Sequence, residues 1–342
     1  MTEIDDNLNT TEAPTPSPQY QLASLTMVGA NPWFSVHSTD SEGRKSSWII
    51  SATLEGEQFN AQLQVWVPEA IQALAGDAKG FVWAITVNDQ LITNSPVATN
   101  DGWTSIEPHP HLQQSSQWFQ RRLRFELQGQ PAAELAGCLL WYNEDLLIGT
   151  FSRRLYRLEG AMAVLEDDGH QPGKLGGIND IVATDQGVFA VGYGGTVLHR
   201  EQRGQWSPLQ GPWPQEAAPF VNVVSAAQGL NNDLWAIVAG GSVIASEGDV
   251  LRPLASLPAE PLGITGFQGE RYVSTLDGCY QVFSDGRATL VKDGLVMGRA
   301  IDAGIALVAF DAEPDELGTA AIHVWLRSRT MDRWVTQVIC RS

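Results

Sequence analysis

The chain has 342 residues, of which 43% are hydrophobic and 18% charged, enough for one large all-β domain or two ordinary ones. Its formal net charge is −18, which argues against nucleic acid or an anionic membrane as a direct partner and favours a basic protein. The three cysteines are far apart and no CxxC motif occurs, so neither a disulfide framework nor a zinc site is expected, and a reducing compartment fits best.

Residues 1–18 form a segment of distinct composition, with four acidic side chains, three prolines and no basic residue. They lack the basic start and apolar run of a signal peptide, and no stretch of the chain approaches the roughly 18 apolar residues of a membrane span. We therefore expect a disordered acidic tail at 1–18, a single domain at 19–342 and a cytoplasmic location.

The first part of the domain reads as strands separated by polar turns, with strands expected at 48–54 and 59–67. Residues 68–74 are expected to form a helical turn, because Ala70, Ile71 and Leu74 fall on one side. Residues 81–106 contain three further short apolar runs, and the Gln-, Ser-, Pro- and His-rich segment 107–117 reads as a loop. Residues 118–127 alternate apolar and charged side chains and predict one strand.

From residue 138 the pattern becomes regular, and it is clearest between Ile178 and Trp206. Four apolar or alternating runs are separated there by three Gly-bearing turns, which predicts a four-stranded antiparallel meander, the blade of a β-propeller. Similar sets follow at 220–254, 263–291 and 300–339, at a mean spacing of about 39 residues, within the range for blades. We count about seven four-stranded blades, with six or eight as the alternatives.

Turn residues recur at one place in three successive sets. Gly194-Gly195, Gly240-Gly241 and Asp277-Gly278 each follow the second predicted strand. Together with 178–181, 188–198 and 204–206, they resemble the blade pattern of the broad BNR-like and WD40/YVTN-like propellers, a group that includes photosystem II assembly propellers. No Trp-Asp pair ends a blade, and 99–103 and 284–286 are only fragments of an Asp-box. The resemblance therefore implies a fold and says little about function.

No motif in the chain points to catalysis. There is no phosphate-binding Gly loop, no HExxH and no G-x-S-x-G motif, so we expect no enzyme, no cofactor and no catalytic residue. His109 and His111 could offer two imidazoles to a metal, but no third ligand lies nearby in the sequence and no metal is expected.

The acidic residues are interpreted through the expected blade geometry. In an antiparallel blade, the turn between the second and third strands lies on the same face as the link to the next blade, and loops on a rigid scaffold commonly bind partners. Aromatic side chains near such loops are frequent interface anchors. The residues expected to bind a partner on this face are Glu166, Asp167, Asp168, Tyr193, Trp213, Asp277, Asp311, Glu313, Asp315 and Glu316. The alternative is an acidic surface with no single partner.

Three functions are weighed. The first is a cytoplasmic binding protein whose acidic face docks a basic protein. The most specific form of this hypothesis is an immunity protein that neutralises a secreted nuclease toxin by occluding its active site, because the chain resembles, in general character, immunity proteins of type VI or Rhs-type toxins. The second is an assembly or scaffold factor like the photosystem propellers. The third is a propeller hydrolase, which would need a buried cluster of carboxylate, Arg and Tyr at the channel mouth.

Overall fold

The computed structural model describes residues 19–341, except 41, 56–57, 100–101, 110–115, 170–175, 231–232, 268, 294–298, 303–305, 315–319 and 329–334. At 19–21, 54, 59 and from 299 onward, it describes the backbone alone. The expected tail at 1–18 lies outside the described residues.

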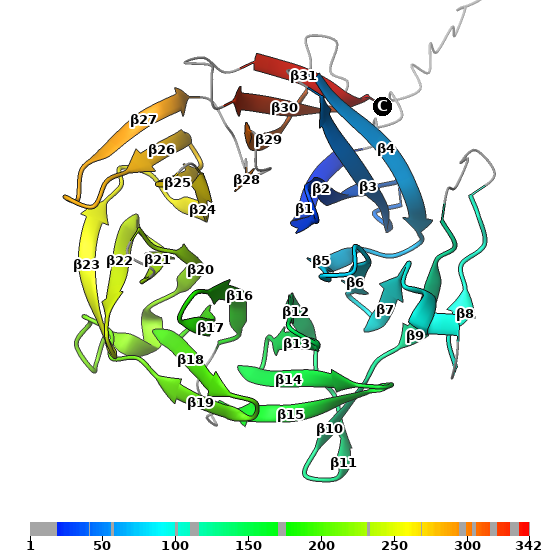
Figure 1. Cartoon of the computed structure of the whole chain (residues 1–342), viewed down its shortest axis with the longest axis horizontal. Coiled ribbons are helices and arrows are strands. Elements are labelled where there is room, and N and C mark those ends of the chain that lie inside the picture. Colours follow the sequence, from blue (N-terminus) through cyan, green and yellow to red (C-terminus); the bar gives the residue numbers. More distant parts are fainter. Residues whose placement is uncertain are drawn as a thin grey trace, which may run out of the picture.

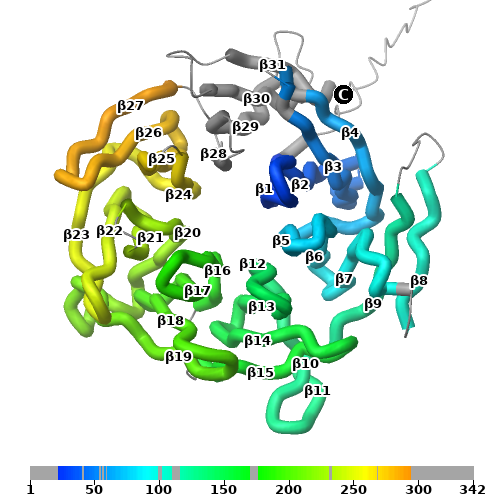
Figure 2. Tube along the Cα trace, viewed as in Figure 1, coloured from blue at the N-terminus to red at the C-terminus, as the bar shows by residue number. Residues whose placement is uncertain are grey.

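The described chain is almost entirely β-structure, arranged as a β-propeller: small, mainly antiparallel sheets stand around a central axis (Figure 1). Each sheet contains a meander whose strands are counted outward from the axis, so that the first strand is innermost. In most sheets the strands follow one another in sequence order, as expected of a meander. Figure 2 shows the same ring as a Cα trace. The two short helices in the described part are of the 3-10 type, and neither could cross a membrane.

The first sheet holds β1 (Gln19–Val28), β2 (Asn31–Thr39), β3 (Lys45–Glu55) and β4 (Gln58–Val67). The second sheet holds β5 (Ile71–Gly76), β6 (Val82–Thr86), β7 (Gln90–Thr93), β8 (Thr104–Ser105) and β9 (Phe119–Arg122), and helix η1 (Pro96–Thr99) lies between β7 and β8. The third holds β10 (Arg124–Leu127), β11 (Gln130–Ala132), β12 (Ala136–Tyr142), β13 (Asp145–Thr150), β14 (Arg154–Glu159) and β15 (Met162–Asp168).

The fourth sheet holds β16 (Ile178–Thr184), β17 (Gly187–Gly192), β18 (Thr196–Gln202) and β19 (Gln205–Pro208), and helix η2 (Ala218–Phe220) leads to the fifth. The fifth holds β20 (Val223–Gln228), β21 (Leu234–Val238), β22 (Ser242–Glu247) and β23 (Val250–Ser256). The sixth holds β24 (Pro261–Phe267), β25 (Glu270–Thr275), β26 (Gly278–Val282) and β27 (Ala288–Asp293).

Beyond these six sheets, whose side chains are largely described, the backbone pairs β28 (Arg299–Asp302), β29 (Ala306–Pro314), β30 (Ala320–Ser328) and β31 (Val335–Arg341) into one more antiparallel sheet. Strand β28 contacts β24 on one side and β1 on the other, and β31 contacts β4. The first and last sheets therefore lie next to each other, and neither takes a strand from the other end of the chain.

Three local expectations were wrong. Residues 71–76 form strand β5, in place of a helical turn, because this apolar run pairs with β6 and packs between β1 and β12. The strand expected at 118–127 is divided at Leu123: β9 pairs with β7 and β8, whereas β10 joins β11 and, in parallel, β15 of the next sheet. Asp311 and Glu313 lie within β29, whose ladder with β30 continues to Pro314, and not in a loop.

The innermost strands of the first six sheets share one irregularity. In β1, β5, β12, β16, β20 and β24 the pairing with the second strand skips one residue near the start of the strand or, in β1, in its middle. Such a β-bulge leaves the extra residue out of the ladder and increases the local twist. The skipped residues are Ala23, Gln72, Gly137, Asn179, Val224 and Leu262.

The core lies between adjacent sheets. Alternate residues of each strand face a neighbouring blade, and β-branched and aromatic side chains suit these pleated surfaces. One buried cluster, for example, joins Ala73, Trp83 and Leu91 of the second sheet to Ile148 and Tyr156 of the third. Because the core is distributed around the ring in this way, each blade is supported by two neighbours, and the turns at either end are held on a rigid frame.

Candidate functional site

One end of the ring is formed by the turns between second and third strands and by the links that lead into each first strand; we call it the turn face. Five backbone hydrogen bonds of 2.9–3.0 Å define it, each from the residue after a second strand to the residue before the first strand of the same sheet. The donor–acceptor pairs are Val87–Ala70, Phe151–Leu135, Tyr193–Gly177, Ala239–Asn222 and Leu276–Glu260. These bonds hold turns and links at one level around the ring.

The turn face carries a concentration of exposed apolar side chains. Four of the five donors are large and hydrophobic, and two link residues add to them; Phe220, 87% exposed, is the most accessible. These six account for most of the ten large hydrophobic side chains that are exposed in the described part of the chain. We call them the apolar arc: Val87, Leu135, Phe151, Tyr193, Phe220 and Leu276. All six lie at one end of the ring, where loops held on a rigid scaffold commonly carry binding residues.

Carboxylates accompany the apolar arc. Asp277 is exposed in the turn after β25, beside Leu276. Glu260, also exposed, accepts a hydrogen bond of 2.8 Å from the backbone N–H of Gly240 in the neighbouring blade. Asp167 and Asp168 end β15 and reach the same face. The side chains of Asp311 and Glu313 are not described, and Asp315 and Glu316 lie outside the described residues.

Glu166 does not belong to this surface. It is the residue skipped in the β14–β15 ladder, and its side chain, only 3% exposed, turns into the interface with the fourth sheet. Its carboxylate accepts hydrogen bonds from Arg157 Nε at 3.0 Å, Arg200 Nη2 at 2.5 Å and Trp206 Nε1 at 3.2 Å. This burial removes Glu166 from the residues that a partner could touch, contrary to its expected role.

The same interface contains a second buried carboxylate, Asp145. It accepts a hydrogen bond of 3.0 Å from Arg200 and further ones from Arg203. Burial pushes the pKa of Asp145 upward, but the hydrogen bonds from Arg203 and Arg200 outweigh it and hold the pKa below its ordinary value. Glu166, Asp145 and their arginines, which we call the interblade ion cluster, thus join the third and fourth sheets.

The turn face between these two sheets is shaped by Arg153, which has a left-handed backbone (φ +71°) in the turn after β13. Its side chain reaches the next blade, where a methyl group on Gly194 would come within 3.1 Å of Nη1. Burial lowers the pKa of Arg153, and burial together with the charge of Asp168 raises the pKa of Asp167. Asp168, 40% exposed, pairs with Arg154 at 2.9 Å.

Tyr193 and Trp213 take different positions. Tyr193 is 43% exposed at the start of the β17–β18 turn, and its backbone bridges to Asn222 of the next sheet. The Trp213 ring is half-buried: it packs over Gly195 and Gly211, where added methyl groups would lie 2.4 Å and 2.1 Å from it, and against the core of the fourth and fifth sheets. Tyr193 is therefore the more accessible of the two expected anchors.

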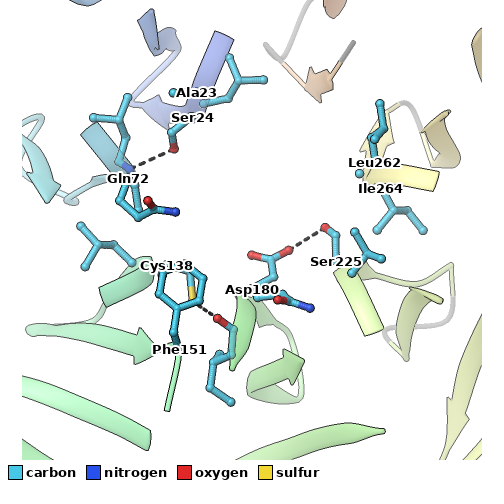
Figure 3. A pocket seen from close by; sticks show the side chains of 18 of the residues that line it. Ala23, Ser24, Gln72, Cys138, Phe151, Asp180, Ser225, Leu262 and Ile264 are labelled. Atoms are coloured by element: carbon cyan, nitrogen blue, oxygen red, sulfur yellow. Dashed lines mark hydrogen bonds between the residues drawn. The ribbon is translucent and has the colours of Figure 1, made fainter. Parts of the chain in front are cut away.

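A cavity of about 480 Å³ opens among the first strands. It includes all six skipped residues, together with Phe151 and Asn222 of the turn face, so it forms the channel mouth on that face. Figure 3 shows the side chains of Gln72 and Asp180 directed into the opening. Asp180 accepts hydrogen bonds from Ser225 Oγ at 2.6 Å and the Ala226 amide at 3.2 Å, and the Asn179 amide donates to Asn222 at 2.6 Å.

Among the described residues that line the channel mouth there is no arginine or tyrosine, so these residues do not form the grouping expected of a hydrolase. A buried carboxylate, arginine and tyrosine do meet elsewhere, where Glu134 accepts hydrogen bonds from Arg154 and Tyr156. Burial and the nearby charge of Glu134 raise the pKa of Tyr156. These residues lie behind the turn face in the third sheet, and Glu134 also binds the Ser152 hydroxyl of the β13–β14 turn, so the cluster fixes that turn.

The histidine considered as a metal ligand is engaged with aromatic rings. The ring of His109 lies 5.2 Å from that of Trp48 and 5.5 Å from that of Trp66. His111 is outside the described residues. Among the residues that the structure describes, no group of three or more His, Cys, Asp or Glu side chains could hold a metal ion.

No protein-family model and no curated protein matches the sequence. Among solved structures, the computationally designed protein Ika8 is similar at a TM-score of 0.51 and 12% identity, over 91% of this chain and 98% of Ika8. BamB from Moraxella catarrhalis matches at 0.49 and 12%, over 95% and 88% of the two chains, and a streptogramin B lyase at 0.48 and 14%, over 77% and 92%. At such identities the similarity concerns the fold alone, and function has to be argued from the site.

Proposed function

We propose that the chain is a protein-binding propeller that docks a basic protein on its turn face. The observation that carries the proposal is the apolar arc: six large hydrophobic side chains exposed at one end of the ring, four of them directly after the second strand of a sheet. Buried apolar and aromatic anchors supply most of the affinity of protein interfaces, and a polar rim surrounds them. Phe151 and Tyr193 are the two aromatic residues of the apolar arc whose backbone N–H groups are hydrogen-bonded to the link before the first strand of the same sheet.

The charge of the chain supports a basic partner. The net charge is −18, and Asp168, Glu260 and Asp277 are exposed beside the apolar arc. Opposite charges around an interface steer encounter and suppress wrong partners, and their effect falls as salt screens them. We therefore expect association that is fast at low ionic strength and slows as salt is added.

The test compares capture of basic proteins, from extracts of the cell of origin, by the parent chain and by a double variant, Phe151→Ser with Tyr193→Ser. Each truncation of an aromatic anchor should cost about 2 kcal/mol, or about 30-fold in affinity, so the double variant should lose its partner. Val97→Ser is the matched control: Val97 is 61% exposed in η1, away from the apolar arc, and its variant should retain the partner.

Identification of the captured protein decides the outcome. A basic protein that is retained by Val97→Ser and lost by the double variant supports the proposal. Equal capture by both variants, or capture restricted to acidic proteins, contradicts it. All variants should first show the same urea midpoint as the parent, because the altered side chains are exposed.

A finer form of this proposal makes the partner a secreted nuclease toxin and the chain its immunity protein. Nucleases carry cationic surfaces for their substrate, and an acidic inhibitor can occupy such a surface. The supporting observation is the same net charge of −18. Mixing the chain with a nuclease toxin encoded beside its gene provides the test, and undiminished cleavage at molar excess of the chain would reject that pairing while leaving the docking proposal in place.

A further inference from the structure

We propose that the channel mouth is a binding site for an alkylammonium group, supplied by a lysine side chain of the docked protein. The inference rests on the proposed function, and it adds a specific pocket at the centre of the turn face. It is carried by three features of the mouth: one carboxylate directed into it, amide side chains in its lining, and apolar residues on β20 and β24.

The charge of the described lining favours a cation. Asp180 is the one carboxylate among the described residues that line it, and none of those residues is basic. Hydrogen bonds from Ser225 and the Ala226 amide fix the carboxylate at the edge of the opening. An ionised acceptor held in place by the scaffold forms stronger hydrogen bonds with a cation than with a neutral donor.

Neutral polar groups also line the mouth. The amide of Gln72 points into the opening from the strand across the mouth (Figure 3). The Asn179 amide nitrogen donates to Asn222 Oδ1 and to the Val223 carbonyl, which fixes its orientation and leaves its oxygen as the acceptor end of the group. An ammonium carries three donors, and carboxylate and amide oxygens are the acceptors that satisfy them.

The remaining wall suits the aliphatic stem of a lysine. Val224 and Leu262, two of the residues skipped in the ladder, line the mouth together with Ile264. Lysine buries its methylene groups against such surfaces while its charged end stays with polar groups. A cavity of about 480 Å³ falls in the usual range for ligand sites of about 300–1,000 Å³, and it admits a lysine with some of the backbone that carries it.

The position of the mouth connects it to docking. Phe151 belongs both to the apolar arc and to the lining of the mouth, and Asn222 follows shortly after Phe220. A protein seated on the apolar arc would therefore cover the opening, and a lysine at the centre of its contact surface would enter it. Desolvated central positions of this kind carry most of the specificity of an interface.

The experiment uses Nα-acetyl-lysine-N-methylamide as a probe and measures its binding to the isolated full chain by NMR titration. Saturable binding is expected with a dissociation constant near the millimolar range, about 4 kcal/mol of binding free energy. Asp180→Asn should weaken it at least about tenfold, equivalent to about 1.4 kcal/mol, because the amide keeps an acceptor for Ala226 but loses the charge. Asp249→Asn, exposed in a turn at the other end of the ring, should bind like the parent.

Two further samples keep the test decisive. The probe acetylated on its side-chain nitrogen has no charge and should not bind. If Asp180→Asn fails to match the parent's urea midpoint, Gln72→Leu replaces it, because Gln72 is left out of the ladder and its removal weakens the same subsite. Absence of saturable binding, or equal binding of the charged and acetylated probes, overturns the inference.

The result is separable from that of the docking test. Failure of the probe to bind, with partner capture still dependent on Phe151 and Tyr193, overturns the ammonium site and leaves the docking surface. A free diamine that binds far more tightly than the lysine probe assigns the site to a small cationic molecule and overturns its assignment to a docked lysine. Probe binding abolished by Asp180→Asn, with no partner captured on the apolar arc, overturns the proposed function instead.

Discussion

Glu166→Gln offers the sharpest test of the interblade ion cluster. The substitution preserves the shape of the side chain but removes a charge that is 3% exposed and contacts two guanidinium groups, those of Arg157 and Arg200. An uncompensated buried charge is costly, and removing one partner of a buried pair destabilises by about 3–5 kcal/mol. The structure predicts a large loss of stability, whereas a surface role for Glu166 predicts almost none.

The structure places the loss at the lower end of that range. Arg200 keeps its contact with Asp145 at 3.0 Å, so its charge is not left alone. The Nε of Arg200, however, is buried and has no acceptor among the described residues. The guanidinium group therefore has no further hydrogen bond that could replace the one lost with the Glu166 charge. We therefore expect a decrease of about 3 kcal/mol in the free energy of unfolding. For a chain of this size that corresponds to a melting temperature lower by about 6 °C, using about 2 °C per kcal/mol.

Urea denaturation followed by tryptophan fluorescence measures the change, with thermal unfolding as a second readout. The matched control is Glu247→Gln, because Glu247 forms an exposed pair with Arg252 in which both side chains are more than half accessible. Exposed pairs contribute about 0–1 kcal/mol, so the control should stay within that range. A Glu166→Gln variant as stable as the control would refute the structural role, and weakened partner capture in that stable variant would restore Glu166 to the docking surface.

Two other predictions concern the turn face. Because burial raises the pKa of Asp167, the folded chain opposes ionisation of this carboxyl group. The variant Asp167→Asn should therefore be more stable than the parent at neutral pH, and the difference should shrink as the pH falls toward the unfolded-state pKa of about 3.9. Urea midpoints measured across this pH range provide the test. Equal midpoints at neutral pH would contradict the assignment. Gly195→Ala should cost more than Gly240→Ala, since both residues have a positive φ but only at Gly195 would the added methyl group meet the Trp213 ring. The backbone alone should cost about 1 kcal/mol or more in each variant, and equal midpoints for the two would show that Trp213 does not pack there.

The repeating parts of the fold could be predicted because they depend on short-range rules. The turns at Gly194-Gly195 and Gly240-Gly241 all have positive φ, and only glycine adopts that conformation without strain. Each turn joins a second to a third strand, at the place predicted from the sequence. The strands of the fourth, fifth and sixth sheets follow from the apolar runs between such turns.

The parts that could not be predicted depend on partners distant in sequence. The alternation at 118–127 continues through Leu123, so nothing local shows that β9 and β10 join different sheets. The position of a bulge depends on the facing strand. At Glu166, which is left out of the β14–β15 ladder, the bulge turns a charged side chain into the protein where simple alternation would leave it outside. Part of the apolar arc could have been predicted from the sequence, because a large hydrophobic residue directly follows several of the second strands, next to the turns.

The residues left out of the ladders around the axis have an unusual freedom. A side chain in a paired position must suit its cross-strand neighbours, whereas the skipped ones take no part in the pairing and project where the blades converge. Their chemistry already differs around the circle, from Gln72 and Asn179 to Val224 and Leu262. Exchanging two or three of them should redirect what the molecule selects without rebuilding its frame, which makes this circle a natural starting point for engineering new recognition.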